Sequence, residues 1–239
     1  MYFYFNNNSS ESFKVILSDF PELPFVQEEI KTVEVGGKDG TLTKRTGKYK
    51  DLLISLECEL LDIENYNEAI RNINNWLNDI EDNRLFFLNN PSKCYKVKKV
   101  TTGNIKNELN IYGAFTIEFT CYPFIYSTEE YEIEVSNNSE FYYSGDIETY
   151  PRMILSGCRG DIQITINDIT TQFSNTDGDI VIDYPQALNE EGASITNEMI
   201  GKFPTLIKGI NNISWTGTIK GMKIKENALY RGWLNDLYI

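Results

Sequence analysis

The sequence predicts a mainly β protein built from two β-sandwich domains. Many segments alternate apolar and polar residues with a period of two, which is the spacing of a half-buried strand. Clear examples are residues 54–60, 115–121 and 162–166. Turns rich in glycine and asparagine separate such segments, as is typical of sandwiches and barrels. The 239 residues suffice for one large domain or two modest ones with independent cores.

A domain boundary is predicted near Pro123. Proline cannot serve a central ladder, so it is expected to end the alternating strand that precedes it. An acidic stretch at 129–134 follows, and a new series of strands begins after it. We therefore expect an amino-terminal domain at residues 1–128 and a carboxy-terminal domain at residues 129–239.

The first elements in the chain are a short strand and a polar arm. Residues 1–5 are apolar but lack the basic residues and cleavage site of a secretion signal, so we interpret them as a strand. Residues 36–50 are too polar for a core, and two glycine clusters bracket a run of threonine and lysine. This pattern predicts an extended hairpin arm, with a disordered loop as the alternative. An arm of this kind needs something to grip, such as a neighbouring copy.

One segment, residues 65–82, has the period of an amphipathic helix. Asn65 can cap its start, and Glu68 completes a capping box. Asn83 tolerates a left-handed exit. We expect the apolar face of this helix to cover an edge or a face of a sheet. The apolar stripe consists of Ala69, Ile70, Ile73, Trp76, Leu77 and Ile80.

Asp177 and Gly178 predict a hairpin turn before a strand at 180–182, because Asp-Gly is a standard hairpin signal. The alternative is the start of a calcium loop, since Asn175, Asp177 and Asp179 have the required alternate spacing. That loop would need a glycine after the third acid and a bidentate glutamate at its twelfth position. Both are missing, so the turn is favoured.

The segment around Gly209 has tightly specified turn chemistry. Gly209 permits a left-handed backbone, while Asn211 and Asn212 suit a turn. Ile213 and Trp215 then fall on one face of a predicted strand. No reactive group lies here, so the segment indicates a defined shape rather than chemistry.

The composition disfavours an enzyme. The chain has no histidine, which removes Ser-His-Asp and Cys-His catalysis and most zinc sites. No phosphate-binding glycine loop occurs. The 35 acidic residues could supply a carboxylate pair for a cell-wall hydrolase, but nothing singles out one pair. We expect no catalytic residues, no metal and no cofactor.

The net charge, the hydrophobic pattern and the cysteine content indicate which classes of partner and environment suit this protein. The net charge of −13 argues against nucleic acid as the main partner, and no apolar run approaches the length of a membrane span. The four cysteines form no C-x-x-C pair, which favours reduced thiols, with Cys58 and Cys121 as core residues. An exposed tryptophan could stack on a sugar ring, so a carbohydrate-binding module is an alternative function.

Several predicted strands, a helix and short sequence segments occur in an order that is typical of one protein family. An alternating strand near residue 56 precedes a helix ending in Trp76-Leu77, and a strand then closes at 119–124. The second half contains Tyr150-Pro151-Arg152-Met153-Ile154 and the segment 204–215. Together they resemble the distal tail protein (Dit) family of long-tailed bacteriophages and prophages. The resemblance implies a lectin-like (jelly-roll or galectin-like) carboxy-terminal sandwich.

The resemblance also implies a structural role without catalysis. Six copies would form a ring at the virion tail tip, after synthesis in the bacterial host cytoplasm. The tail tube protein, a tail-associated lysin or fibre hub, and receptor-binding proteins would dock on this ring. DNA would pass through the channel without specific binding, and no part would insert into a membrane. By position, the resemblance assigns the inter-subunit contacts to Thr41, Leu42, Thr43, Lys44, Arg45, Thr46, Gly47, Lys48 and Tyr49.

Overall fold

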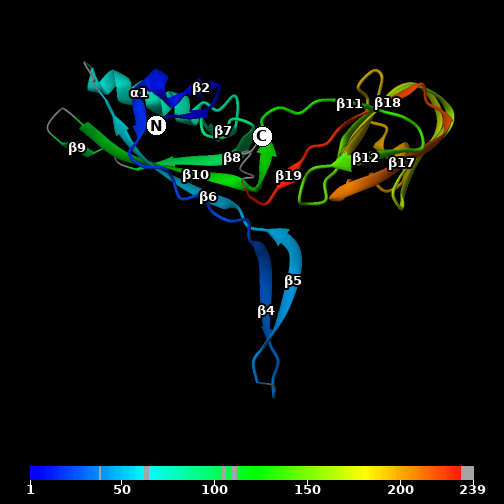
Figure 1. The fold of residues 1–239 in the computed structure, drawn as a ribbon, viewed down its shortest axis with the longest axis horizontal. Helices are drawn as coiled ribbons and strands as arrows, with labels where there is room; N and C mark the ends of the chain where they lie inside the picture. The colour runs from blue at the N-terminus through cyan, green and yellow to red at the C-terminus, as the bar shows by residue number, and fades with distance from the viewer. Residues whose placement is uncertain (38, 62–64, 104–105, 109–111, 233–239) are drawn as a thin grey trace. The chain divides into compact units, whose positions relative to one another are not determined.

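The computed structural model describes residues 1–37, 39–61, 65–103, 106–108 and 112–232. The chain is mainly β, and its described residues divide into two compact units, Met1–Thr128 with Arg231 and Gly232, and Glu129–Tyr230 (Figure 1). The expected fold class, mainly β with two β domains, is confirmed. Of the expected ranges, Lys38 in the arm and residues 233–239 in the second domain lie outside the described residues.

The first unit contains ten strands of the described chain, one α-helix and one 3-10 turn. They are β1 (Phe3–Phe5), β2 (Asn8–Ser9), η1 (Ser10–Phe13), β3 (Val15–Leu17), β4 (Glu28–Glu34), β5 (Thr41–Tyr49), β6 (Leu52–Leu60), α1 (Tyr66–Asn78), β7 (Arg84–Phe87), β8 (Lys93–Thr102), β9 (Lys106–Glu108) and β10 (Tyr112–Ser127).

Its main sheet has the strand order β2-β1-β7-β8-β10-β6-β3, with β9 also paired to β10. The predicted alternation in β6 is confirmed, because every second residue from Leu52 to Leu60 is buried. The prediction that Pro123 ends its strand is wrong, since β10 continues to Ser127. A register shift lies between Cys121 and Ile125 in the β8–β10 ladder. Such an irregularity accommodates a proline that cannot donate to the ladder.

The start of α1 confirms the predicted cap at Asn65 but not the full capping box, because Glu68 accepts from the side chain of Asn65 and not from its backbone N–H. The backbone N–H of Glu68 donates to Oδ1 of Asn65 at 3.4 Å, and Nδ2 of Asn65 donates to Oε2 of Glu68 at 3.1 Å. Figure 1 shows α1 on one face of the sheet, beside β1 and β2. Three residues of the predicted apolar stripe are buried: Ile73, Trp76 and Leu77.

The far end of the helix was predicted wrongly. The helix ends at Asn78 instead of residue 82, and Ile80 is 37% exposed. Asn83 is not among the residues with a left-handed backbone. Its side chain instead donates to the carbonyl of Val97 at 3.1 Å, so it holds the chain to β8.

A side chain from the amino terminus stops the helix. Asn6 has a left-handed backbone (φ 49°) and is buried. Its Nδ2 donates to the carbonyls of Trp76 at 2.8 Å and Asp79 at 2.7 Å, and its Oδ1 accepts from the N–H groups of Glu81 at 2.8 Å and Asp82 at 3.1 Å. Because one side chain binds groups on both sides of the helix terminus, the chain turns away there.

The described chain of the second unit contains nine strands, of which β11 to β18 form one sheet. Its elements are β11 (Ile133–Val135), β12 (Ser139–Tyr143), β13 (Arg152–Ile166), β14 (Ile169–Asp183), β15 (Gln186–Asn189), η2 (Thr196–Glu198), β16 (Ile200–Gly201), β17 (Gly209–Thr218), β18 (Gly221–Lys225) and β19 (Leu229–Tyr230).

β13 and β14 are long strands, and different parts of each pair with different neighbouring strands of the second unit's sheet. The first half of β13 pairs with β18 and its second half pairs with β17. Register shifts near Gly157 and Gly160 separate the two halves. Bulges bend strands and increase their twist. The sheet can therefore fold over on itself around a core that includes Met153, Ile164 and Phe173.

Two turn predictions in this unit are wrong. Asp177 and Gly178 lie inside β14, opposite β13, so the Asp-Gly pair marks the irregular stretch of a long strand rather than a hairpin. Asn211 and Asn212 lie inside β17. Asn211 is fully buried, and its side chain bonds both backbone groups of Ile207, at 2.9 and 2.8 Å. It therefore fixes the turn that precedes the strand.

Candidate functional site

The hairpin arm is the candidate site that the sequence singled out. β4 and β5 pair with each other in a separate two-stranded sheet. In the chain this hairpin follows β3 and precedes β6, and Figure 1 shows β4 and β5 as a distinct two-stranded ribbon. All nine predicted contact residues lie on β5, and all except Thr46 and Tyr49 are exposed. The partner strand β4, which begins at Glu28, was not anticipated.

One face of the arm combines apolar and basic side chains. Val33 lies directly opposite Leu42, and Lys31 lies directly opposite Lys44. Since side chains alternate between faces, these two cross-strand pairs share a face. Val33 is 51% exposed and Leu42 is 52% exposed. Like charges placed opposite each other destabilise a hairpin. No ion pair of Lys31 or Lys44 occurs in the described part of the chain. This face is therefore suited to an acidic, partly apolar surface.

The base of the arm is fixed to its own unit. The ring of Tyr49 packs edge-on against Phe124 at a centroid distance of 4.9 Å, and its hydroxyl accepts from Arg231 at 3.1 Å. The hydroxyl of Thr46 donates to the carbonyl of Glu29 at 2.8 Å. Gly47 takes a left-handed backbone (φ 71°) next to this bond. Tyr49 thus anchors the arm to its own unit, Thr46 ties β5 to β4 within the arm, and the exposed residues beyond them can contact another surface.

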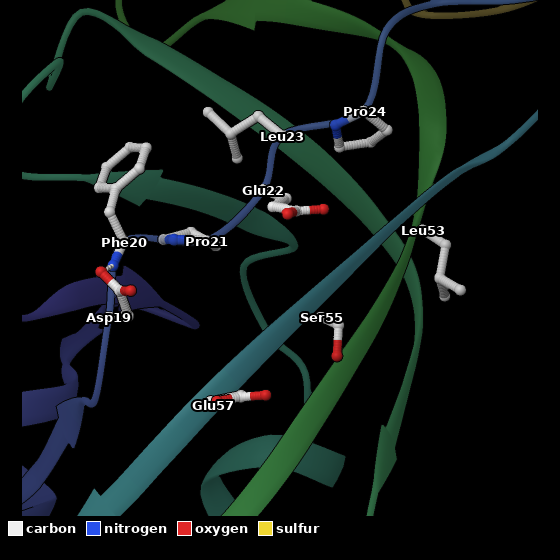
Figure 2. Close-up of a pocket in the computed structure, with 9 residues that line it drawn as sticks. All are labelled: Asp19, Phe20, Pro21, Glu22, Leu23, Pro24, Leu53, Ser55 and Glu57. Carbon is white, nitrogen blue, oxygen red and sulfur yellow. Dashed lines mark hydrogen bonds between the residues drawn. The ribbon is translucent and has the colours of Figure 1, made fainter.

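A groove lies beside β6 in the same unit, with a volume of about 510 Å³. Figure 2 shows the side chains of Leu53, Ser55 and Glu57 on one side and the segment 19–24 on the other. Leu53 is 56% exposed and Phe20 is 39% exposed. The acidic residues of its lining are Asp19, Glu22 and Glu57.

The groove exists because the chain leaves the sheet after β3. β3 pairs with β6 only at Cys58–Leu60, whereas β10 pairs with all of β6. The N–H of Ser18 still donates to the carbonyl of Glu57 at 2.9 Å, and the chain then diverges. Pro21 and Pro24 have no N–H group to continue the ladder. Sequence reasoning missed this groove, although two prolines close after a strand are a signal that pairing stops.

The second unit exposes a cluster of aromatic rings. Tyr150 and Tyr184 stack with centroids 3.9 Å apart, and Phe203 packs edge-on against Tyr184 at 5.3 Å. Tyr150 is 39% exposed and Tyr184 is 51% exposed. Close by in the β13–β14 ladder, Arg152 bonds carboxylates of Glu132 at 3.1 Å and Asp183 at 3.5 Å. Rings and charged planar groups therefore occur together on this surface.

The four cysteines are buried and form no disulfide bond. The prediction that Cys58 and Cys121 are core residues is confirmed, and Cys94 and Cys158 are buried as well. Burial raises the pKa of Cys58 and of Cys121 to about 12, and that of Cys158 to about 11. A thiol with so high a pKa carries almost no nucleophilic thiolate near neutral pH.

Three further observations concern the described residues only. No group of three metal-ligating acidic, cysteine or histidine side chains gathers among them. Every buried side-chain nitrogen and oxygen in these parts of the chain has a hydrogen-bond partner. None of their helices has the length and apolar character needed to cross a membrane.

Comparison with known proteins identifies the fold. Residues 8–121 match the family model of the phage tail protein RIFT-related domain. The structure is similar to Dit (gp 19.1) of phage SPP1, described as a paradigm of the hub adsorption apparatus in phages that infect Gram-positive bacteria. The TM-score is 0.68 at 13% identity, over 94% of this chain and 98% of that chain. A search of curated protein sequences gave no match. The fold that the resemblance to the distal tail protein family implies is thus confirmed: the first half matches a phage tail domain, and nearly the whole chain has a Dit-like fold.

Proposed function

We propose that this chain is a structural protein of the phage tail tip, in which six copies close into a ring. The observation that carries the proposal is the Dit fold across 94% of the chain, together with the phage tail family match. SPP1 Dit is described as part of a hub adsorption apparatus. A hub works by joining copies and partners, which needs shape and contact surfaces rather than reacting groups.

The hairpin arm supports self-assembly independently of the comparisons. A two-stranded hairpin is marginally stable in water by itself. This arm leaves Ile30, Val33 and Leu42 each about half exposed. Contact with another copy would bury these side chains and hold the hairpin in place. The predicted inter-subunit residues beyond the anchored base, Thr41 to Arg45, are the ones that would form this contact.

The proposed partners follow from the position of the ring. The tail tube protein would dock on one side and a tail-associated lysin or fibre hub on the other. Receptor-binding proteins would attach to the second units. DNA would pass through the channel without specific binding, because a chain with net charge −13 repels phosphates. The site of action is the tail tip of the virion, reached after synthesis in the host cytoplasm.

Light scattering and negative-stain electron microscopy of the purified full chain test this proposal. We expect rings whose mass is six times the 27.5 kDa of one chain. Addition of the tail tube protein or the tail-associated lysin should stabilise these rings. A chain that keeps the single-chain mass at high concentration and in the presence of these neighbours would refute the proposal.

A second candidate function is carbohydrate binding by the second unit. The exposed stack of Tyr150 and Tyr184 favours it, because an aromatic face can pack on the apolar face of a pyranose ring. Arg152 and Asp183 could then bond sugar hydroxyls. Binding of the protein to host cell-wall polysaccharide, and its loss in Tyr184→Ala, would support this function. Equal binding by the wild type and the variant, or no binding at all, would remove it.

A further inference from the structure

We propose that the groove beside β6 is the acceptor for the hairpin arm β4–β5 of a neighbouring copy. The inference rests on the proposed self-assembly and names the surface that receives the arm. The groove is the space defined by the segment 19–24 and by Leu53, Ser55 and Glu57. Three independent features of the two surfaces match: their backbone edges, their charges and their apolar side chains.

The backbone edges match because β6 has an unpaired stretch at the groove. The carbonyl of Glu57 accepts from Ser18, and the N–H of Leu61 donates to Lys14, so odd-numbered residues direct their backbone groups toward β3. Backbone direction alternates along an antiparallel strand, so Leu53 and Ser55 direct theirs the same way. In the described chain, no strand pairs with them on that side.

An unpaired edge is a template for a strand from another chain. The arm is a two-stranded sheet, so β4 and β5 each have one free edge as well. Strand addition at β6 would satisfy the backbone groups of Leu53 and Ser55. It would also convert a marginal hairpin into part of a larger sheet, which is the condition for a stable β structure.

The charges match in sign and position. The groove lining contains three carboxylates and no basic side chain. The arm presents Lys31 and Lys44 side by side on one face, with no ion pair between either of them and a described carboxylate. Placing this face over Glu22 and Glu57 would relieve the repulsion within the arm and within the groove. Complementary charges of this kind fix the register of an interface.

The apolar side chains match in the same way. Val33 and Leu42 stand next to the two lysines on the arm, and Phe20 and Leu53 stand next to the carboxylates of the groove. Leu42 and Leu53 are each more than half exposed in the single chain. The arm therefore does not fill the groove of its own chain, and the occupant that we propose is the arm of another copy.

A charge swap tests the assignment, with self-association of the full chain measured by light scattering and analytical ultracentrifugation. Lys44→Glu and Glu57→Lys should each weaken self-association by about tenfold or more, because like charges would meet. The double variant Lys44→Glu/Glu57→Lys should recover most of the loss. Glu140→Lys, an exposed residue of the other unit with the same charge change, should have no effect.

A disulfide cross-link provides a second measurement, which does not depend on a change in the strength of self-association. The four native cysteines are buried, so Leu42→Cys and Leu53→Cys would introduce the accessible thiols. Mild oxidation of the double variant should give a ladder of linked chains, and neither single variant should. If rings form but Glu57→Lys leaves them intact and no ladder appears, the groove is not the acceptor and the proposed ring function stands. A wild-type chain that never self-associates would instead refute both.

Discussion

Two successive strands of this protein, β5 and β6, have opposite environments. Each is nine residues long, and only Lys50 and Asp51 separate them. In β6 every second side chain is buried in the core, whereas no side chain of β5 is buried. Burying one apolar side chain contributes about 1.5–3 kcal/mol, so β6 is held by its own unit. β5 has no buried side chain to hold it in the same way, which is in keeping with the proposal that part of it contacts another copy.

Matched leucine truncations in the two strands test this comparison most strongly. Leu56→Ala in β6 removes a fully buried side chain and should lower the free energy of unfolding by about 2–5 kcal/mol. Leu42→Ala in β5 should change it by less than about 0.5 kcal/mol, because the side chain is 52% exposed. Urea unfolding followed by tryptophan fluorescence measures both values.

Assembly should show the reverse order for these variants. Leu42→Ala should weaken self-association although it leaves the single chain intact, and light scattering can follow this effect. If Leu42→Ala destabilised the single chain as much as Leu56→Ala, the arm would have to pack against its own unit. The proposed division between a folded sheet and an assembly arm would then be wrong.

Asn6 tests whether the sheet region depends on polar contacts as much as on burial. Asn6→Ala removes four hydrogen bonds, each worth about 0.5–1.5 kcal/mol, so the expected loss is about 2–6 kcal/mol. Asn6→Gly keeps the left-handed backbone and isolates the side-chain contribution. Urea unfolding of both variants measures the loss, and a change below about 0.5 kcal/mol would show that water replaces these bonds.

Local patterns predicted the parts of the fold that depend on neighbours in sequence. The period of two located β6, and the spacing of Asn65 and Glu68 located the start of α1. The polar, glycine-bracketed run located β5. It did not reveal β4, because a strand without a core has no regular apolar alternation to recognise.

Contacts between distant segments account for the failures. The helix was predicted to continue to residue 82 because the side chain that ends it, Asn6, is 70 residues away from Trp76. Asp177 and Gly178 suited a turn, but long-range pairing with β13 kept them in a strand. The groove combines the segment 19–24 with β6, and no local pattern could place these together.

A smaller effect is expected at the amino-terminal cap of α1, which the sequence did predict. Asn65→Ala removes the acceptor for the N–H of Glu68 and should cost about 0.5–1 kcal/mol. Asn65→Asp keeps an acceptor and should retain most of the stability. Far-UV circular dichroism and urea unfolding measure both variants. A loss as large as that of Asn6→Ala would mean that the cap supports more of the sheet region than its exposed position suggests.

The smallest effect concerns the pH dependence of stability, and it contrasts an ion pair of the sheet region with one of the arm. Asp82 accepts from Nε of Arg84 at 2.9 Å and from Nη2 at 2.6 Å, and these bonds hold the pKa of Asp82 below its ordinary value of 3.8. A lowered pKa contributes stability above the unfolded-state value, and this contribution is lost as the pH falls through the folded-state value. The wild type should therefore lose stability below about pH 4 more steeply than Asp82→Asn.

Glu28→Gln should have little effect at any pH, because Arg45 is 80% exposed and lies 3.7 Å from Glu28. Thermal unfolding between pH 2.5 and pH 7 distinguishes the two variants, and equal pH profiles for the wild type and Asp82→Asn would show that the Asp82–Arg84 pair adds nothing to the fold.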